Sequence, residues 1–413
     1  MDICDKSKCT ACGACIHICP KKCIRYVRDD YRVKYAQRET EKCIECNLCM
    51  KTCPSNRNIE KNVPLKCYAA WSNDNIIRRN SASGGIAAEF YKYAIENGYW
   101  IVGVTVNEHF EAIYSITKEG WRQFQNSKYT YSNMGDMYHV ISDKLKRREK
   151  VLYIGLPCQV AALKMFLSTK SVEDRNLFTI DLICHGITPE DYLKEHIEQI
   201  EYKTGKRAEE VFFRDPEFHT YKYMFTLKHR GKIFYKRIVD RNDAYQIAYH
   251  RGIAYRGNCY SCQFAESRRV GDITLSDFTG VGSKKTCHYT SENVSCVMVN
   301  SNKGRNFYND LLSTGRLFSE ERPMEEQVDS QITMQRPIPM PLERTKFLQA
   351  YKESGDFSRS VHFAAKKIIF FNEINHITRI RDIRILIFRM IPKSMKDKTK
   401  DKMRKIISLL YHK

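Results

Sequence analysis

Eight cysteines near the N-terminus repeat one spacing twice. The run Cys9-x2-Cys12-x2-Cys15-x3-Cys19-Pro20 is followed by Cys43-x2-Cys46-x2-Cys49-x3-Cys53-Pro54. At this doubled spacing three thiolates of one run hold an iron–sulfur cluster, and the fourth crosses to the other cluster. The spacing therefore predicts two [4Fe–4S] clusters, one on Cys9, Cys12, Cys15 and Cys53, and one on Cys43, Cys46, Cys49 and Cys19.

Zinc is the alternative ligand for these cysteines, because Cys-x2-Cys pairs also hold structural zinc ions. A zinc site needs only four sulfurs in two pairs, so a three-plus-one run that occurs twice argues against it. A tight loop can bend three sulfurs around one cluster, and the proline after the fourth cysteine ends that loop. We therefore expect residues 1–62 to form a bacterial-type 2[4Fe–4S] ferredoxin module.

Four later cysteines form a third candidate set. Cys158 and Cys184 follow predicted strands at 151–154 and 178–183, and a predicted helix at 159–167 joins these strands. Such a unit makes a parallel strand pair, and open α/β sheets bind ligands beyond the carboxyl ends of their strands. Cys259-x2-Cys262 supplies two more thiols, although this pair alone would also fit a zinc site or a redox dithiol. For Cys158 or Cys184 taken singly, a buried structural thiol is the alternative.

The bulk composition is that of a soluble globular protein with two or three domains. The chain has 413 residues, of which 42% are hydrophobic and 28% charged. Its N-terminus does not resemble a signal peptide, and clustered cysteines without one indicate metal binding in a reducing compartment. No apolar run approaches the roughly 18 residues that cross a bilayer. We expect a cytoplasmic protein.

The formal net charge of +21 overstates the charge of the loaded protein. Each cluster with four thiolates carries about −2, so three clusters lower the balance by about six. Residues 379–413 hold twelve Lys and Arg against three Asp and Glu. A basic tail can meet an acidic redox partner or an anionic membrane surface. Because no base-reading motif accompanies the charge, we expect no nucleic-acid binding.

Residues beyond 62 have mixed α/β composition. Helices are predicted at 86–97, 136–149, 159–167, 190–203 and 361–391, and strands at 99–106, 111–117, 151–154, 178–183, 211–213, 221–228 and 232–239. The fold class is thus α+β or α/β, with a mixed-sheet domain behind the ferredoxin module. We place domains at 63–150 and 151–335, and a linker with a basic helical tail at 336–413.

Five short motifs occur in one order along the chain. They are Ser81-x-Ser83-Gly84-Gly85, Gly155-Leu156-Pro157-Cys158-Gln159, Cys184-His185-Gly186, Asn258-Cys259-x2-Cys262 and Gly271-Asp272-Ile273-x3-Asp277-Phe278-x-Gly280. Over residues 64–320 the chain resembles the beta subunit of coenzyme F420-reducing hydrogenases and dehydrogenases. The resemblance implies FAD beside a [4Fe–4S] cluster, which would fall on Cys158, Cys184, Cys259 and Cys262. Thr279 stands where many members have Trp, a departure that concerns the substrate face.

FAD needs backbone N–H groups for its pyrophosphate, and a helix N-terminus after small residues supplies them. The candidates are Ser81, Ser83, Gly84 and Gly85, with Lys128 as a further phosphate contact; an ordinary helix cap is the alternative. No G-x-G-x-x-G sequence opens a βα unit, so we expect no Rossmann domain. His185 is a conceivable proton donor, but a histidine that only makes structural hydrogen bonds is the favoured interpretation, and we assign no catalytic residue.

These observations lead to two functional hypotheses. The first is an iron–sulfur flavoprotein oxidoreductase with three [4Fe–4S] clusters and FAD. It would exchange electrons with a ferredoxin or another subunit, and its small-molecule acceptor would be F420-like or a glycan-pathway substrate. The second is an electron-transfer subunit of a larger redox complex, without a substrate site of its own.

Overall fold

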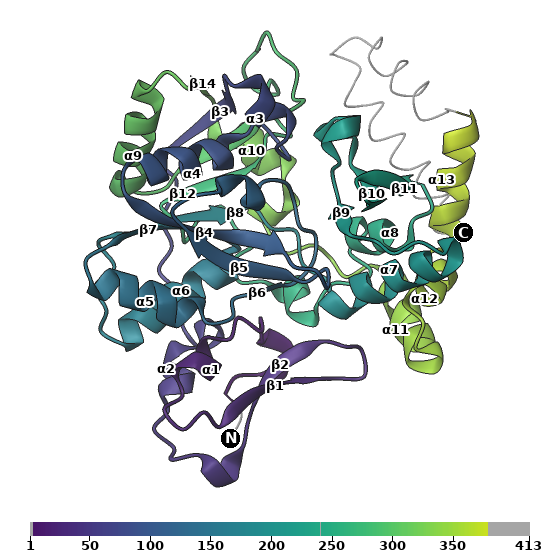
Figure 1. Cartoon of the computed structure of the whole chain (residues 1–413), viewed down its shortest axis with the longest axis horizontal. Helices are drawn as coiled ribbons and strands as arrows, with labels where there is room; N and C mark the ends of the chain where they lie inside the picture. Colours follow the sequence, from purple (N-terminus) through teal and green to yellow (C-terminus); the bar gives the residue numbers. More distant parts are fainter. Residues whose placement is uncertain (1–2, 240, 379–413) are drawn as a thin grey trace.

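The computed structural model describes residues 3–239 and 241–378. Figure 1 shows three bodies: a small N-terminal module, a large sheet domain above it, and a second lobe beside the sheet domain. The predicted basic tail at 379–413 lies outside the described residues. No helix of the described part is long and apolar enough to cross a membrane.

The N-terminal module is built from two matching halves. In each half a cysteine loop leads into one short helix, α1 (Ala14–Ile18) or α2 (Leu48–Thr52), and a hairpin of β1 (Ile24–Arg28) and β2 (Lys34–Arg38) joins the halves. Both loops have left-handed backbone at equivalent positions, which are Ala11 and Gly13 in the first run and Glu45 and Asn47 in the second. The repeated spacing thus produces a repeated backbone.

Nine strands of the described chain form the central sheet. In spatial order they are β14 (Leu317–Glu321), β3 (Lys66–Ser72), β13 (Ser295–Val299), β12 (Ile273–Asp277), β8 (Leu177–Leu182), β7 (Lys150–Gly155), β4 (Tyr99–Val106), β5 (Ala112–Thr117) and β6 (Ser132–Asn133). The four central strands β12, β8, β7 and β4 are parallel, and antiparallel pairs flank them. A mixed sheet was predicted and is confirmed.

Helices cover both faces of this sheet. One face packs against α4 (Ile86–Glu96) and α9 (Asn302–Ser313), around Phe90, Phe178 and Phe307. The other face packs against α5 (Met137–Lys146) and α6 (Pro157–Thr169). That second core continues into α1 and its cysteines, so the N-terminal module is an extension of the sheet domain and shares its buried interior (Figure 1). Two further short helices, α3 (Asn75–Arg79) and α10 (Met324–Ser330), complete this body.

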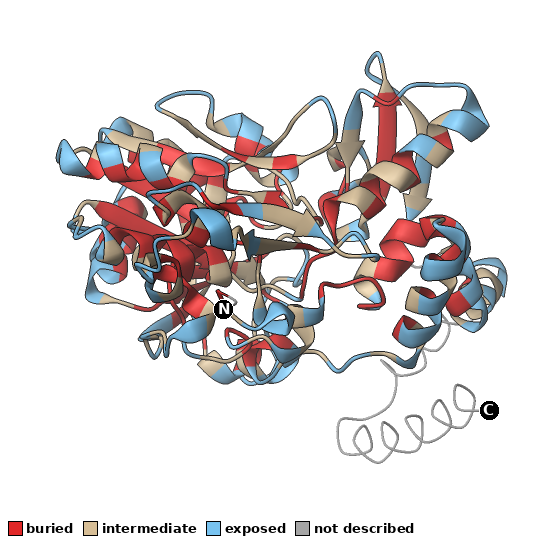
Figure 2. Ribbon diagram, turned by 90° about the horizontal axis from the view of Figure 1, so that it is seen from below, coloured by how far each residue is buried: buried red, intermediate tan, exposed pale blue. Residues whose placement is uncertain are grey.

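The second lobe has its own core. A three-stranded sheet of β9 (Glu210–Phe212), β10 (Met224–His229) and β11 (Lys232–Ile238) packs with α7 (Glu190–Thr204), α8 (Ala244–His250), α11 (Leu342–Ser354), α12 (Phe357–Ala364) and α13 (Lys366–Thr378). Figure 2 shows buried residues gathered along the central sheet and separately in this lobe. Single 3-10 turns connect the elements at Lys6–Lys8, Thr40–Lys42, Pro54–Asn56, Trp121–Phe124, Pro216–Phe218, Thr220–Lys222, Gly257–Ser261 and Ile332–Met334.

Three predicted elements differ from the structure. The helix expected at 361–391 is broken at Ala365 between α12 and α13, and its last part lies outside the described residues. The strand expected from residue 221 starts at Met224, because 220–222 form a 3-10 turn and Tyr223 has a left-handed backbone. The division placed at residue 150 falls inside the central sheet, since strands from 63–150 and from 151–335 pair there.

Candidate redox site

The cysteines predicted for the first cluster meet inside the shared core, and we call Cys9, Cys12, Cys15 and Cys53 the inner set. Cys12, Cys15 and Cys53 are each less than 9% exposed. Burial raises the pKa of Cys15 well above its usual value, and the charges of Cys12, Cys9, Cys53 and Cys49 raise it further. Four sulfurs that converge from two distant runs fit the ligand set of one cluster.

Three tyrosines hold the loop of the inner set. Tyr131 and Tyr26 donate hydrogen bonds to the Ala11 carbonyl oxygen at 2.7 and 2.8 Å, and Tyr138 donates to the Cys12 carbonyl oxygen at 2.8 Å. Tyr131 and Tyr138 belong to the sheet domain. Because both are buried, these hydrogen bonds fix the first cysteine loop against the body of the protein.

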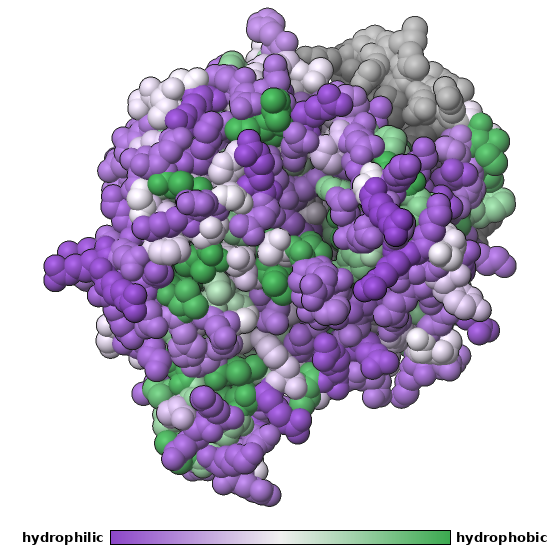
Figure 3. Space-filling model, viewed as in Figure 1, coloured by the Kyte–Doolittle hydropathy of each residue, from purple (hydrophilic) through white to green (hydrophobic). Residues whose placement is uncertain are grey.

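We call the cysteines predicted for the second cluster (Cys19, Cys43, Cys46 and Cys49) the outer set. Cys49 is buried, and Cys19 and Cys43 are half-buried. All four line one small cavity. Cys46 is exposed, and the neighbouring Ile44 is 56% exposed. Hydrophobic residues gather at this end of the molecule in Figure 3, over the N-terminal module. The outer set is thus the one open to another protein.

Cys4 and Cys23, which lie outside the two runs, sit beside these sets at matching places. The Cys23 sulfur is 3.4 Å from the Cys19 sulfur, and its pKa is also raised by Cys43. Cys4 lies against Cys53 and Cys9. Each thiol thus adjoins the first cysteine of one run and the last cysteine of the other.

The third set (Cys158, Cys184, Cys259 and Cys262) is brought together by the central sheet. β7 and β8 are parallel neighbours, as predicted, and Cys184 follows β8 by two residues. Cys158 was predicted between the strand and the helix. It lies instead in the first turn of α6, because this helix begins at Pro157 and not at residue 159. Cys259 lies in the 3-10 turn Gly257–Ser261, and Cys262 follows that turn.

The third set lies next to the first cysteine loop. Cys158 and Cys262 pack against the core that holds Cys12 and Cys15, and Cys184 and Cys259 pack against the small cluster around Ala11. Burial raises the pKa of Cys158 well above its usual value, and the charges of Cys262, Cys184, Cys12 and Cys259 raise it further. Cys12 belongs to the inner set, so the two sets are adjacent. Within the described residues no group of His, Cys, Asp or Glu side chains is arranged to hold a single metal ion.

A cavity of about 700 Å³ opens beyond the third set, between the central sheet and the second lobe. Cys184 and Gly186 line it on the side of the third set, and the N-terminus of α4 lines it on another side. Pockets of about 300–1,000 Å³ are typical of cofactor and ligand sites. The cavity is large enough for a dinucleotide cofactor next to the third set.

The N-terminus of α4 presents free backbone groups to this cavity. Its cap residue Gly85 has a φ of +85° and gives no side-chain hydrogen bond to the first turn. Ile86, Ala87 and Ala88, the first residues of the helix, all line the cavity. Uncapped N–H groups at a helix start attract anionic groups such as phosphates. This geometry fits a pyrophosphate.

The predicted flavin residues divide into two groups. Ser81, Ser83 and Gly85 line the cavity. Gly84 lies behind it: its N–H donates to the Ser295 hydroxyl at 2.9 Å, and a Cβ there would meet the Ala70 carbonyl oxygen at 2.6 Å. Gly84 therefore acts by allowing the loop to pack closely against the sheet.

Lys128 lines the cavity, but its ammonium group already donates hydrogen bonds to other protein groups. Its Nζ donates to the carbonyl oxygens of Phe124, Gln125 and Asn126, at 3.1, 2.6 and 3.1 Å. Burial lowers the pKa of Lys128 to about 7, while the three carbonyl contacts favour the charged form. An ammonium group has three donors, so Lys128 is placed to shape this loop, and a direct phosphate contact would require it to exchange a partner.

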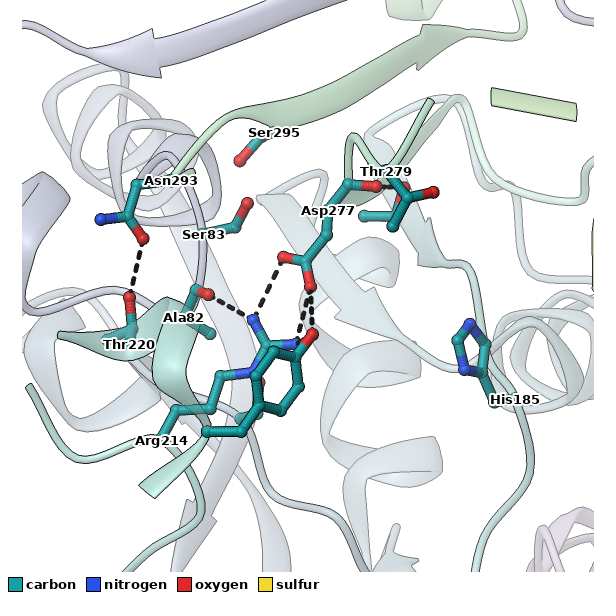
Figure 4. Close-up of polar contacts among 12 residues, drawn as sticks. Ala82, Ser83, His185, Arg214, Thr220, Asp277, Thr279, Asn293 and Ser295 are labelled. Atoms are coloured by element: carbon teal, nitrogen blue, oxygen red, sulfur yellow. Dashed lines mark hydrogen bonds and ion pairs between the residues drawn. The ribbon is translucent and has the colours of Figure 1, made fainter. Parts of the chain in front are cut away.

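A hydrogen-bonded group of Arg214, Asp277 and Tyr223 on the cavity wall was not predicted from the sequence (Figure 4). Arg214 contacts the Asp277 carboxylate at 2.7 Å, and Tyr223 donates to the same carboxylate at 2.9 Å. Burial would raise the pKa of Asp277, but Arg214 and Tyr223 hold it below its usual value. Asp277 lay in a quoted motif, whereas a lone arginine in an irregular segment gave no signal.

His185 also lines the cavity, away from Arg214 in Figure 4. Its Nε2 is 3.0 Å from the Gln331 side-chain oxygen, and Gln331 donates to Thr279 at 2.9 Å. Burial lowers the pKa of His185, which favours the neutral ring. Thr279 thus belongs to the hydrogen-bonded wall beside His185.

Comparison with known proteins gives two family matches. Residues 8–58 match the 4Fe-4S dicluster domain, and residues 148–325 match the C terminus of the coenzyme F420 hydrogenase/dehydrogenase beta subunit. No curated protein sequence matches the chain. A solved structure of the F420-reducing [NiFe] hydrogenase complex from Methanosarcina barkeri, derivatised with xenon, has 17% identity and a TM-score of 0.46, over 77% of this chain and 92% of that chain.

The matches agree with the resemblance and the module predicted from the motifs. The first covers both cysteine runs, and the second covers the whole third set. Residues 8–58 form a 4Fe-4S dicluster domain, and residues 148–325 behind it belong to the family of C-terminal domains of coenzyme F420 hydrogenase/dehydrogenase beta subunits.

Proposed function

We propose that this chain is an iron–sulfur flavoprotein oxidoreductase in which electrons move between the protein surface and the large cavity. The path runs from the outer set to the inner set, then to the third set and to FAD in the cavity. Each set would hold one [4Fe–4S] cluster. The family match of residues 148–325 supports an oxidoreductase role.

The position of the third set carries this proposal. Cys158 is close enough to Cys12 for their charges to interact, and Cys184 lines the cavity. A cluster on the third set would therefore stand between the inner set and any cofactor in the cavity. If these cysteines were only structural thiols, nothing would require them to lie beside both Cys12 and the cavity.

The cavity residues would hold and orient FAD. Bound FAD would supply hydride chemistry and exchange of single electrons. The first turn of α4 would receive its pyrophosphate, and Gly84 and Gly85 let the loop before that turn pack closely on its neighbours. Arg214 and Asp277 neutralise each other on the facing wall, so this wall offers hydrogen bonds without a net charge. His185 would stand near the reacting end and could hand a proton to an acceptor.

Anaerobic analysis of iron, sulfide and flavin tests the proposal. The purified chain should contain about twelve irons and one flavin, and the Cys259→Ser variant should lose about four irons while the dicluster domain stays loaded. Cys287→Ser is the matched control, because Cys287 is half-buried and belongs to none of the sets. About eight irons in the unaltered chain, or zinc without a yellow chromophore, would contradict the proposal.

The exposed outer set supports a second candidate function. A surface cluster next to an exposed Ile44 suits transient contact with another redox protein or subunit. The chain would then be an electron-transfer subunit whose substrate site lies in its partner. Steady turnover of a small-molecule acceptor by the isolated, flavin-loaded chain would exclude this second candidate.

A further inference from the structure

Arg256 is a fully buried cation without a carboxylate partner. It is 1% exposed, and no Asp or Glu among the described residues forms an ion pair with it. Its Nη2 donates to the carbonyl oxygens of Cys9 and Lys34, at 3.1 and 2.6 Å. Its Nη1 is buried and has no hydrogen-bond partner. Burying an unpaired charge costs several kcal/mol, so an opposite charge is expected nearby.

Two other cations near the third set do have a carboxylate partner. Arg269 and Lys61 both act on Cys262, but Arg269 is paired with Asp181 at 2.9 Å and Lys61 with Glu266. Glu190, a buried carboxylate of this region, already contacts Lys34 and Arg28. Arg256 is therefore left with a net positive charge that the described protein groups do not neutralise.

Arg256 lies between two cysteine sets. Its positive charge acts on Cys9 of the inner set and on Cys259 of the third set. It precedes Cys259 by three residues and donates to the backbone oxygen of Cys9. A [4Fe–4S] cluster with four thiolates carries about −2, so a cluster on each side would supply the missing negative charge.

We propose that Arg256 is the shared counter-ion of the inner and third clusters and raises the reduction potentials of both. An added electron makes each cluster more negative, and a nearby cation in a low-dielectric interior stabilises that state. The unpartnered Nη1 would donate to a cluster or ligand sulfur. Because an electron added to one cluster repels an electron added to its neighbour, reduction of one cluster would also lower the potential of the other. The inference rests on the proposed cluster on the third set.

The test is an anaerobic redox titration of the full chain, followed by EPR, on Arg256→Met. We expect the reduced-to-oxidised ratio of the inner and third clusters to fall about tenfold at a fixed potential, which is 59 mV for one electron. The outer cluster should keep its potential. Arg256→Lys retains the charge, so we expect it to shift both ratios less than the methionine variant does.

Arg344→Met is the matched control. Arg344 is also buried without a carboxylate partner in the described residues, and it acts on Cys259 but donates to Ile253 and Tyr260. We expect it to shift the third cluster alone. If Arg256→Met fails to retain iron, Arg256→Gln takes its place, since an amide can still donate to one of the two carbonyls.

Three results would overturn the inference. They are unchanged potentials in an iron-replete variant, an equal shift of the outer cluster, and an equal loss in Arg256→Lys and Arg256→Met. The iron content of the unaltered chain decides separately whether the third cluster exists. Eight irons would contradict the proposed function, whereas twelve irons with unshifted potentials would contradict only the role of Arg256.

Discussion

The two cysteine runs have the same spacing and the same local backbone, yet the protein treats them differently. The inner set is buried against α5 and α6, while the outer set includes the exposed Cys46. Tyr131, Tyr138 and Arg256 all reach the first cysteine loop from the rest of the chain. The inner set, which takes Cys53 from the second run, thus belongs to the core of the body, whereas the outer set includes an exposed thiol.

This asymmetry gives the module a direction. A symmetrical pair of clusters can pass electrons either way, and nothing in the module itself distinguishes its ends. Packing places the inner set beside the third set and leaves the outer set for a partner. Reduction potentials depend on charge, hydrogen bonds to sulfur and solvent exposure, so these surroundings should also separate the two clusters energetically.

The largest expected difference between the inner and outer sets comes from replacing one cysteine ligand in each set. Cys12→Ser and Cys46→Ser should each lose about four irons. Only Cys12→Ser should also loosen the contact between the module and the sheet domain, because Cys12 packs in the shared core. Limited proteolysis under anaerobic conditions should then release residues 3–58 faster from Cys12→Ser. Equal protease sensitivity of the two variants would break the comparison.

A smaller effect is expected from the tyrosines that hold the first loop. Tyr138→Phe leaves the Cys12 carbonyl without its buried donor, which should lower the free energy of unfolding by about 1–3 kcal/mol. The urea midpoint measures this change. Tyr202→Phe is the control, since Tyr202 is 91% exposed and should change stability by less than about 0.5 kcal/mol. A Tyr138→Phe midpoint equal to the control would show that this hydrogen bond does not secure the module.

The smallest expected effect compares equivalent backbone positions in the two loops. Gly13 has a φ of +87° and Asn47 a φ of +58°. Gly13→Ala should cost about 1–2 kcal/mol for a left-handed alanine, and its Cβ would approach the Tyr26 hydroxyl oxygen to 2.6 Å. Asn47→Ala should cost less, because Asn47 already carries a Cβ there. Thermal unfolding of the loaded proteins would measure both, and the reverse order would contradict the structure.

Much of the fold could be predicted from local patterns. Apolar runs in the sequence predict the strands at 99–106 and 112–117. Two more such runs with a helical segment between them predict the unit β7–α6–β8. The second lobe was harder, because β9 is short and Tyr223 interrupts the expected strand with a left-handed backbone. The break at Ala365 was not predicted, because apolar residues continue on both sides of it and the sequence pattern shows no interruption.

The candidate site was predictable where residues carry their own signature. Cysteine spacing identified the inner and outer sets, and strand ends identified two members of the third set. Arg214 was missed, because its partner Asp277 lies 63 residues away in the chain. The occupied ammonium of Lys128 was missed too, since the sequence does not show which way three consecutive carbonyls point.

The two ferredoxin runs can be recognised from the residues alone, because ligand spacing within a tight loop is a local property of the chain. The crossover unit that brings Cys158 and Cys184 to one edge of the sheet is local in the same way. Three features depend on packing instead: which cysteine set is the more buried, that the third set adjoins Cys12, and that Arg256 lies between these two sets. These are contacts between segments up to 247 residues apart, and they form only when the cores pack.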